Sequence, residues 1–173
     1  MMNIRTNYKT MLFMMVLSAV IAVLPAQAMI DGIEGNVFNF EAKDGYIYSG
    51  EGGAHYMWGF SNGAGVMQYP GPTMIVNEGD TITVNLTNNL SVPVSIVFPG
   101  HPGVTASGGT QGLLTREAPA NGGTVSYSFV VEMPGTYMYH SGTNCQLQIE
   151  MGLFGAIIVR PAGFMPGMGM GGM

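Results

Sequence analysis

Three side chains that commonly bind soft metal ions lie close together near the end of the sequence. His140, Cys145 and Met151 fall within 12 positions, on a predicted loop between two adjacent strands, with the spacing H-x4-C-x5-M. Imidazole, thiolate and thioether groups together suit copper, especially Cu(I). His101 lies in an earlier loop and supplies a second imidazole if that loop packs beside residues 140–151. These four residues are therefore the candidate metal ligands.

Each candidate also has an ordinary structural interpretation. His140 ends a predicted strand, where its ring can bond to backbone in a half-buried site. Met151 can fill an irregular gap in the core, because thioether side chains are flexible. Cys145 can be an incidental small residue, or it can cross-link two chains in an oxidising compartment. Both interpretations stay open on the sequence alone.

A second group of sulfur ligands lies at the C-terminus. Residues 163–173 consist almost entirely of glycine and methionine, which predicts a flexible tail that adds nothing to a core. Met165, Met168, Met170 and Met173 are two or three residues apart. Converging thioethers can hold Cu(I) loosely, and the alternative is a solvated low-complexity segment.

Residues 1–28 have the three parts of a secretory signal peptide. Arg5 and Lys9 give a positive start, an apolar stretch follows, and the segment ends in Ala-Gln-Ala. The apolar stretch, from Met11 to Leu24, is 14 residues long, shorter than the roughly 20 residues that span a bilayer. We expect cleavage after Ala28, export to the periplasm or the extracellular space, and no membrane span in the remaining chain.

Composition excludes several classes of protein. Only 9% of the 173 residues are charged, against roughly 25% in an ordinary soluble domain, which argues against a helical bundle. The formal charge of −5 argues against a nucleic-acid partner, since no basic patch exists to neutralise phosphates. A single cysteine cannot form an internal disulfide. The length allows one domain, which we expect over residues 29–162.

Short β-prone segments recur along the chain, each closed by glycine, proline or asparagine. Residues 81–87 alternate apolar and polar side chains, and so do residues 125–131. This pattern predicts strands with one buried face, and the regular spacing predicts an all-β antiparallel sandwich or barrel. The expected strands cover residues 37–42, 46–49, 55–60, 73–76, 81–87, 93–98, 124–132, 136–140 and 155–159.

Two further expectations concern residues outside the candidate metal site. Residues 99–123 contain many turn-forming residues and predict a long surface loop without strands, in which Arg116 and Glu117 form a solvated charged pair. His55 lies in an aromatic run with Tyr56 and Trp58, so we expect it to have a packing role.

Four segments of the chain form a recognisable series of motifs. They are the G-P-T and E-G-D-T entry within residues 69–81, the strand at 84–90, the P-G-T-x-x-Y-H segment at 134–141, and the closing strand at 152–159. In order and spacing they resemble the N-terminal cupredoxin domain of multicopper oxidases and copper nitrite reductases. The resemblance covers roughly residues 36–162. It implies a Greek-key β-sandwich of cupredoxin type, and it implies copper as the cofactor.

The sequence departs from this family at most of the copper ligands that the resemblance implies. Full oxidases place two H-x-H pairs in this domain, but residues 97–100 contain no histidine, and the partner position of His140 is Gly142. The nitrite reductase pattern has cysteine after the histidine, where this chain has Ser141, and the axial methionine position falls near Leu153. Of the four family histidines, only His140 remains.

These observations lead to three alternative functions. The first is an exported cupredoxin-fold protein that binds copper or acts as an accessory and does not catalyse oxidation alone. The second is an enzyme subunit whose copper sites are shared between chains, with His140 as one ligand. The third is a metal-free structural or interaction domain. Other cupredoxin domains or a second copy of the chain are the expected partners.

Overall fold

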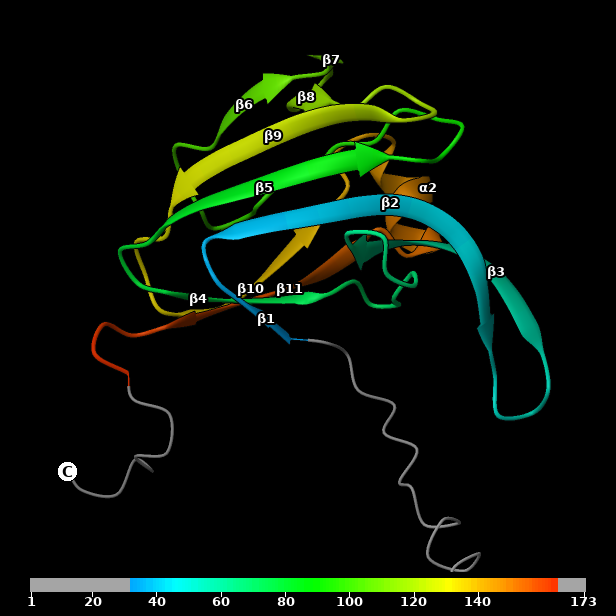
Figure 1. Ribbon diagram of the computed structural model, residues 1–173, viewed down its shortest axis with the longest axis horizontal. Coiled ribbons are helices and arrows are strands. Elements are labelled where there is room, and N and C mark those ends of the chain that lie inside the picture. The colour runs from blue at the N-terminus through cyan, green and yellow to red at the C-terminus, as the bar shows by residue number, and fades with distance from the viewer. Residues whose placement is uncertain (1–31, 165–173) are drawn as a thin grey trace, which may run out of the picture.

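The computed structural model describes residues 32–164, which form two β-sheets packed face to face and one short helix (Figure 1). Sheet A has the strand order β1 (Gly32–Glu34), β4 (Thr73–Asn77), β11 (Phe154–Arg160), β10 (Gly135–His140). Sheet B has the order β3 (Ala54–Asn62), β2 (Val37–Tyr48), β5 (Thr81–Asn88), β9 (Gly123–Val130), β6 (Thr105–Gly108). A small ribbon is formed by β7 (Thr110–Gln111) and β8 (Arg116–Glu117), and α2 (Cys145–Met151) separates β10 from β11.

The predicted signal peptide and the methionine residues of the predicted tail lie outside the described residues. Within residues 32–164, no helix is long and apolar enough to cross a membrane.

The two alternating segments form strands with one buried face, as predicted. The apolar side chains of β5 and β9 that point into the sandwich are Ile82, Val84, Leu86, Val125, Tyr127 and Phe129. From the opposite sheet, Tyr139 stacks on Phe40 with 5.5 Å between ring centroids. The Tyr139 hydroxyl donates a 2.7 Å hydrogen bond to Pro72 O, so this buried phenol has a partner.

The strand directions differ from the antiparallel arrangement that we predicted. β4 runs parallel to both β1 and β11, and β2 runs parallel to β5. An alternating pattern shows which face of a strand is buried. The direction of the neighbouring strand depends instead on the crossover connections, which the pattern does not report.

The segment 93–98 is not a strand, contrary to the prediction. Only Val94 and Val97 form isolated bridges there, to Ala118 and His140 respectively. Three consecutive side chains, those of residues 94–96, are buried, which an alternating strand does not allow. The predicted strands 37–42 and 46–49 are instead one continuous strand, β2.

Residues 99–123 are not strand-free either, because β6, β7 and β8 lie within them. The segment 140–151, which we predicted as a loop, contains α2. The helix begins after Asn144, whose φ is 43°, and ends at Gly152, whose φ of 117° suits glycine.

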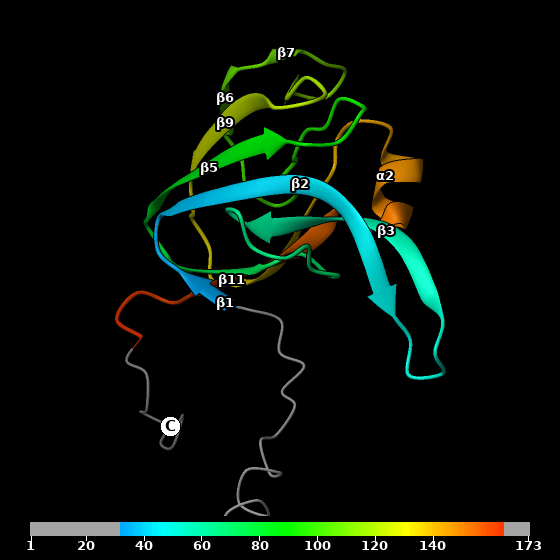
Figure 2. The same cartoon turned by 45° about the vertical axis from the view of Figure 1, so that its right-hand side comes forward.

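A two-stranded arm projects from the sandwich. β2 pairs with β5 only over residues 37–42, whereas its pairing with β3 continues to Tyr48. The remainder of β2 and the start of β3 bend away from the body as a hairpin, which both ribbon views show (Figures 1 and 2).

Candidate functional site

His140 is the last residue of β10 and lies at the end of the sandwich that faces α2 and the β7–β8 ribbon. Its backbone is fixed twice to Val97: Val97 N–H donates to His140 O over 2.8 Å, and His140 N–H donates to Val97 O over 3.2 Å. The imidazole is half-buried, with Nδ1 2.9 Å from Ser141 O.

This contact determines the tautomer of the neutral ring. A carbonyl oxygen only accepts hydrogen bonds, so Nδ1 of His140 carries the proton and Nε2 keeps its lone pair. Histidines that bind metals commonly donate their second N–H to a backbone carbonyl in this way. The ring of His140 is therefore oriented as a metal ligand would be, with Nε2 as the available atom.

The position expected to supply the second histidine is closed. Gly142 is buried, and a Cβ atom added to it would lie 2.7 Å from Val97 Cγ1 and 3.0 Å from Ser95 Oγ. These contacts are shorter than van der Waals distances, so residue 142 has no room for an imidazole without local rearrangement.

Ser141, which stands where nitrite reductases have cysteine, serves a structural purpose. It is fully buried, and its hydroxyl donates to Gln148 Oε1 over 2.5 Å. Gln148 Nε2 in turn donates to Pro93 O over 2.9 Å. These bonds fasten α2 to the body of the sandwich. Leu153, at the expected axial position, is buried in the core.

Cys145 and Met151 are the first and last residues of α2. Six residues of α-helix separate their Cα atoms by about 9 Å along the axis and place them on different faces. Both side chains are half-buried, and the thiol is free.

His101 lies inside the sandwich. Only 7% of it is exposed, and its ring packs against Tyr137 at 4.4 Å and Phe129 at 5.1 Å between centroids. Tyr137 precedes His140 by three residues along β10, a distance of about 10 Å. Nε2 of His101 is buried without a hydrogen-bond partner, and burial lowers the pKa of this imidazole below its usual range.

Within residues 32–164, no three His, Cys, Asp or Glu side chains converge on a common point. The four predicted ligands are also separated in the structure. His140 lies at one end of the sandwich, and His101 is packed farther along β10. The sulfur atoms of Cys145 and Met151 belong to opposite ends of α2. The structure presents His140 as a single oriented imidazole.

Arg116 and Glu117 are not the solvated pair that we predicted. Both are half-buried in β8 and bond in different directions. The Arg116 guanidinium donates to the carbonyls of Gly108 and Gly109, whereas the Glu117 carboxylate accepts a 2.8 Å hydrogen bond from Thr143 Oγ1. Thr143 Oγ1 is also 2.9 Å from Ser95 Oγ, so Glu117 helps to hold the loop that follows His140.

Two exposed leucines beside His140 were missed by sequence reasoning. Leu113 and Leu114, at the turn between β7 and β8, are 93% and 61% exposed. A Cβ atom on Gly142 would lie 3.7 Å from Leu114 Cβ, so this turn borders the closed position. Consecutive leucines inside a glycine-rich loop were the available signal, because such a loop gives them no core to enter.

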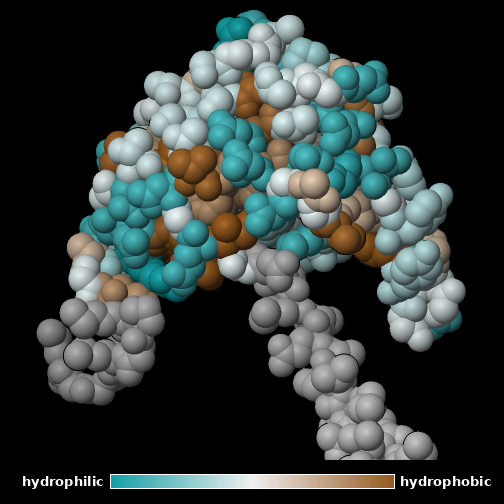
Figure 3. All heavy atoms as spheres, in the orientation of Figure 1, coloured by the Kyte–Doolittle hydropathy of each residue, from teal (hydrophilic) through white to brown (hydrophobic). Residues whose placement is uncertain are grey.

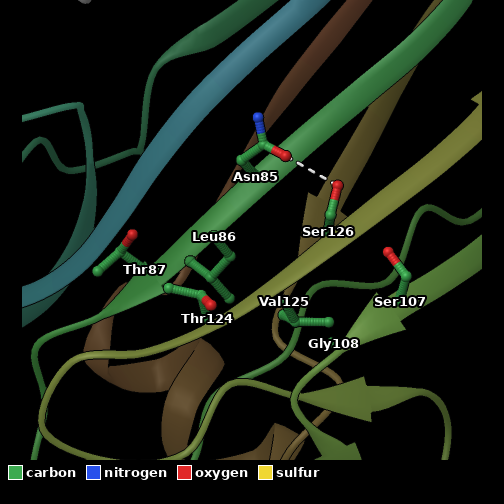
Figure 4. Close-up of a pocket in the computed structure, with 8 residues that line it drawn as sticks. All are labelled: Asn85, Leu86, Thr87, Ser107, Gly108, Thr124, Val125 and Ser126. Atoms are coloured by element: carbon green, nitrogen blue, oxygen red, sulfur yellow. Dashed lines mark hydrogen bonds between the residues drawn. The ribbon is translucent and has the colours of Figure 1, made fainter.

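An open groove of about 270 Å³ lies elsewhere, between β5, β9 and β6 (Figure 4). Five of its eight lining residues have hydroxyl or amide side chains, and the other three are Leu86, Gly108 and Val125. Ser126 Oγ donates to Asn85 Oδ1 over 2.8 Å. None of the eight lining residues titrates near neutral pH, so the groove offers no general acid or base.

His55 is exposed on β3, so the predicted packing role is wrong. β3 begins in the projecting arm, where His55 and Tyr56 are exposed, whereas Trp58 nearer the body packs partly against the core.

The two sheets and their strand order define a cupredoxin-like domain. The structure superposes on copper nitrite reductase from Nitrosomonas europaea with a TM-score of 0.60 and 26% identity, covering 77% of this chain and 43% of that one. It also superposes on the McoA multicopper oxidase of Aquifex aeolicus with a TM-score of 0.63 and 22% identity, covering 80% and 30% of the two chains.

The sequence pattern of the multicopper oxidase family matches residues 41–163, and the chain belongs to that family. It is 37% identical over 107 residues to an L-ascorbate oxidase of Cucurbita pepo var. melopepo, covering 54% of this chain and 17% of the relative. It is 35% identical over 96 residues to multicopper oxidase MCE of Talaromyces pinophilus, covering 54% and 15%. The chain thus spans about one sixth of the length of these relatives, and it resembles the first cupredoxin domain.

The predicted family resemblance and sandwich fold are confirmed. The family implies copper, and among the family's ligand positions only His140 fits it. The His140 ring is already oriented by the contact of Nδ1 with Ser141 O. The other positions do not fit: Gly142 is closed by Val97, the Ser141 hydroxyl is occupied by Gln148, and Leu153 is buried.

Proposed function

We propose that this chain is an exported accessory protein of the multicopper oxidase family. It supplies one imidazole to a copper ion at the end of the sandwich, and a partner carrying further cupredoxin domains supplies the other ligands. In this role the chain does not oxidise a substrate alone.

The orientation of His140 carries the proposal. Its Nδ1–H is held by Ser141 O, so Nε2 is left as a ligand atom on a half-buried ring. A single neutral imidazole holds copper weakly, so a stable site needs ligands from elsewhere.

The surroundings of His140 favour a protein partner as that source. Leu113 and Leu114 expose apolar side chains next to the site, and exposed apolar surface of this kind marks interaction sites. A partner that covers the leucines would also exclude water from the bound ion.

Copper retention tests this role. The purified chain is titrated with copper without a dialysis step, and bound metal per chain is measured beside His140→Ala, with His55→Ala as an exposed-histidine control. We expect weak retention by the unaltered chain, loss in His140→Ala and no change in His55→Ala.

Equal copper retention in His140→Ala and in the unaltered chain would show that other ligands, such as the C-terminal methionines, bind the copper. A variant that lacks residues 165–173 identifies that case. Complete failure of the unaltered chain to retain copper would contradict the copper role and favour the metal-free interaction domain.

A further inference from the structure

The core-facing side of sheet B continues along the arm beyond the point where sheet A ends. Phe38, Phe40 and Ala42 of β2 are buried in the core. The next residues on the same face of β2, Asp44, Tyr46 and Tyr48, are exposed. Because the pairing of β2 with β3 runs without a break, Ala54, Tyr56 and Trp58 lie on this face opposite them. We call these six residues the arm face.

The arm face is aromatic and internally ordered. Tyr46 and Tyr56 pack edge to face with 5.6 Å between centroids. Tyr56 Oη donates to Asp44 Oδ2 over 2.9 Å and accepts a 3.3 Å hydrogen bond from Trp58 Nε1. These contacts hold the rings in place before any partner arrives, which reduces the entropy lost on binding.

The opposite side of the arm has a cover. On the arm face, Trp58 at the base packs partly against the core, whereas the three tyrosines have no cover within the described residues. Met67 packs under the arm: a Cβ atom on Gly45 would lie 3.4 Å from Met67 Cε, and one on Gly59 would lie 2.7 Å from Met67 Cγ. On the arm face, Tyr46, Tyr48 and Tyr56 are 61%, 80% and 46% exposed. The arm also stands clear of the body in the space-filling view (Figure 3).

We infer that the arm face is a self-association surface, on which the arm of a second copy of this chain packs face to face. Each arm is a two-stranded layer that lacks the second layer of a sandwich, and a two-fold related arm supplies that layer to both copies. An isolated two-stranded ribbon is marginally stable in water, so the contact also stabilises the arms.

The chemistry and size of the arm face fit a copy of itself. Asp44 is its only charged residue, and that carboxylate already accepts a hydrogen bond from Tyr56. A tyrosine can bury about 150–250 Å², so the exposed parts of the three tyrosines amount to roughly 400 Å² per copy. Standard interfaces bury about 800 Å² per partner, so we expect a weak, reversible dimer that forms at about 1–100 μM.

Sedimentation velocity across this concentration range tests the inference, with EDTA and a reductant present to prevent bridging by metal or Cys145. We expect the unaltered chain to dimerise and Tyr46→Ser/Tyr48→Ser to raise the dissociation constant at least about tenfold. Leu113→Ser/Leu114→Ser removes exposed apolar side chains from the His140 end of the sandwich. This variant should leave the dissociation constant of the dimer unchanged.

A chain that stays monomeric at the highest concentration would overturn the inference. So would a dimer that the leucine variant abolishes and the tyrosine variant does not. Neither result bears on copper retention by His140, so the two proposals fail separately.

Cross-linking gives an independent readout. In a Cys145→Ser background, Ala54→Cys places a thiol on the arm face, and oxidation should link two copies. Val66→Cys, at another highly exposed position, is the control. Equal cross-linking at both positions would contradict the face-to-face arrangement.

Discussion

Ser141 and Gln148 meet in the buried space between the end of β10 and α2, with Ser141 Oγ 2.5 Å from Gln148 Oε1. Through this bond the residue that follows His140 is fastened to the helix, and Gln148 is fastened in turn to Pro93 O. Ser141, at the position where the nitrite reductase pattern has cysteine, therefore anchors the chain beside His140 to α2.

Ser141→Ala should lower the free energy of unfolding by about 1–3 kcal/mol, because it leaves the buried Gln148 Oε1 without its donor. Urea denaturation measures this loss. Gln146→Ala, at an exposed position of the same helix, should change stability far less. Equal effects of the two substitutions would contradict the anchoring role.

Gly142→Ala should destabilise the chain by about 1–3 kcal/mol, because the added methyl group meets Val97 Cγ1 at 2.7 Å. The same substitution in a Val97→Ala background should cost less, since the obstructing carbon is removed. Gly50→Ala is the control, because a Cβ atom there has no heavy atom within 4 Å. Additive costs in the double variant would show that position 142 is not closed by Val97.

Stability should fall in mild acid partly through His101. Burial lowers the pKa of its imidazole in the folded chain, so the neutral ring is favoured there, while the unfolded chain protonates near pH 6.5. The contribution of His101 to the free energy of unfolding is therefore complete above pH 6.5. It is lost as the pH falls from that value towards the lowered pKa of His101 in the folded chain.

His101→Phe should therefore flatten the decline in unfolding free energy between pH 7 and 5. Urea melts at several pH values measure it, with His55→Phe as the exposed control. An unchanged pH profile in His101→Phe would rule out this contribution.

The sequence predicted those parts of the fold that depend on local alternation. The buried faces of β5 and β9 followed from residues 81–87 and 125–131, because each strand has one solvent side. The predicted strand at 93–98 was wrong because residues 94–96 are all buried, so this segment has no solvent-facing side. The strand directions were predicted wrongly because they depend on long-range crossover connections, which local alternation does not report.

The site was only partly predictable, for a similar reason. His140 was identified from its motif, but its orientation depends on the carbonyl of Ser141, and the closure of Gly142 depends on Val97, 45 positions earlier. α2 was missed because seven residues are too few to show a helical period, although Gly152 is a suitable C-terminal residue. The exposure of Leu113 and Leu114 depends on how the β7–β8 ribbon sits against the sandwich.

The number of imidazoles bound to Cu(II) in the purified chain tests the central claim most directly. Pulsed EPR resolves the coupling to the remote ring nitrogen of each bound histidine. We predict one imidazole in the unaltered chain, none in His140→Ala, and one in His101→Phe. Two or more coupled imidazoles, or a signal that persists unchanged in His140→Ala, would contradict the assignment of His140 as the single oriented ligand.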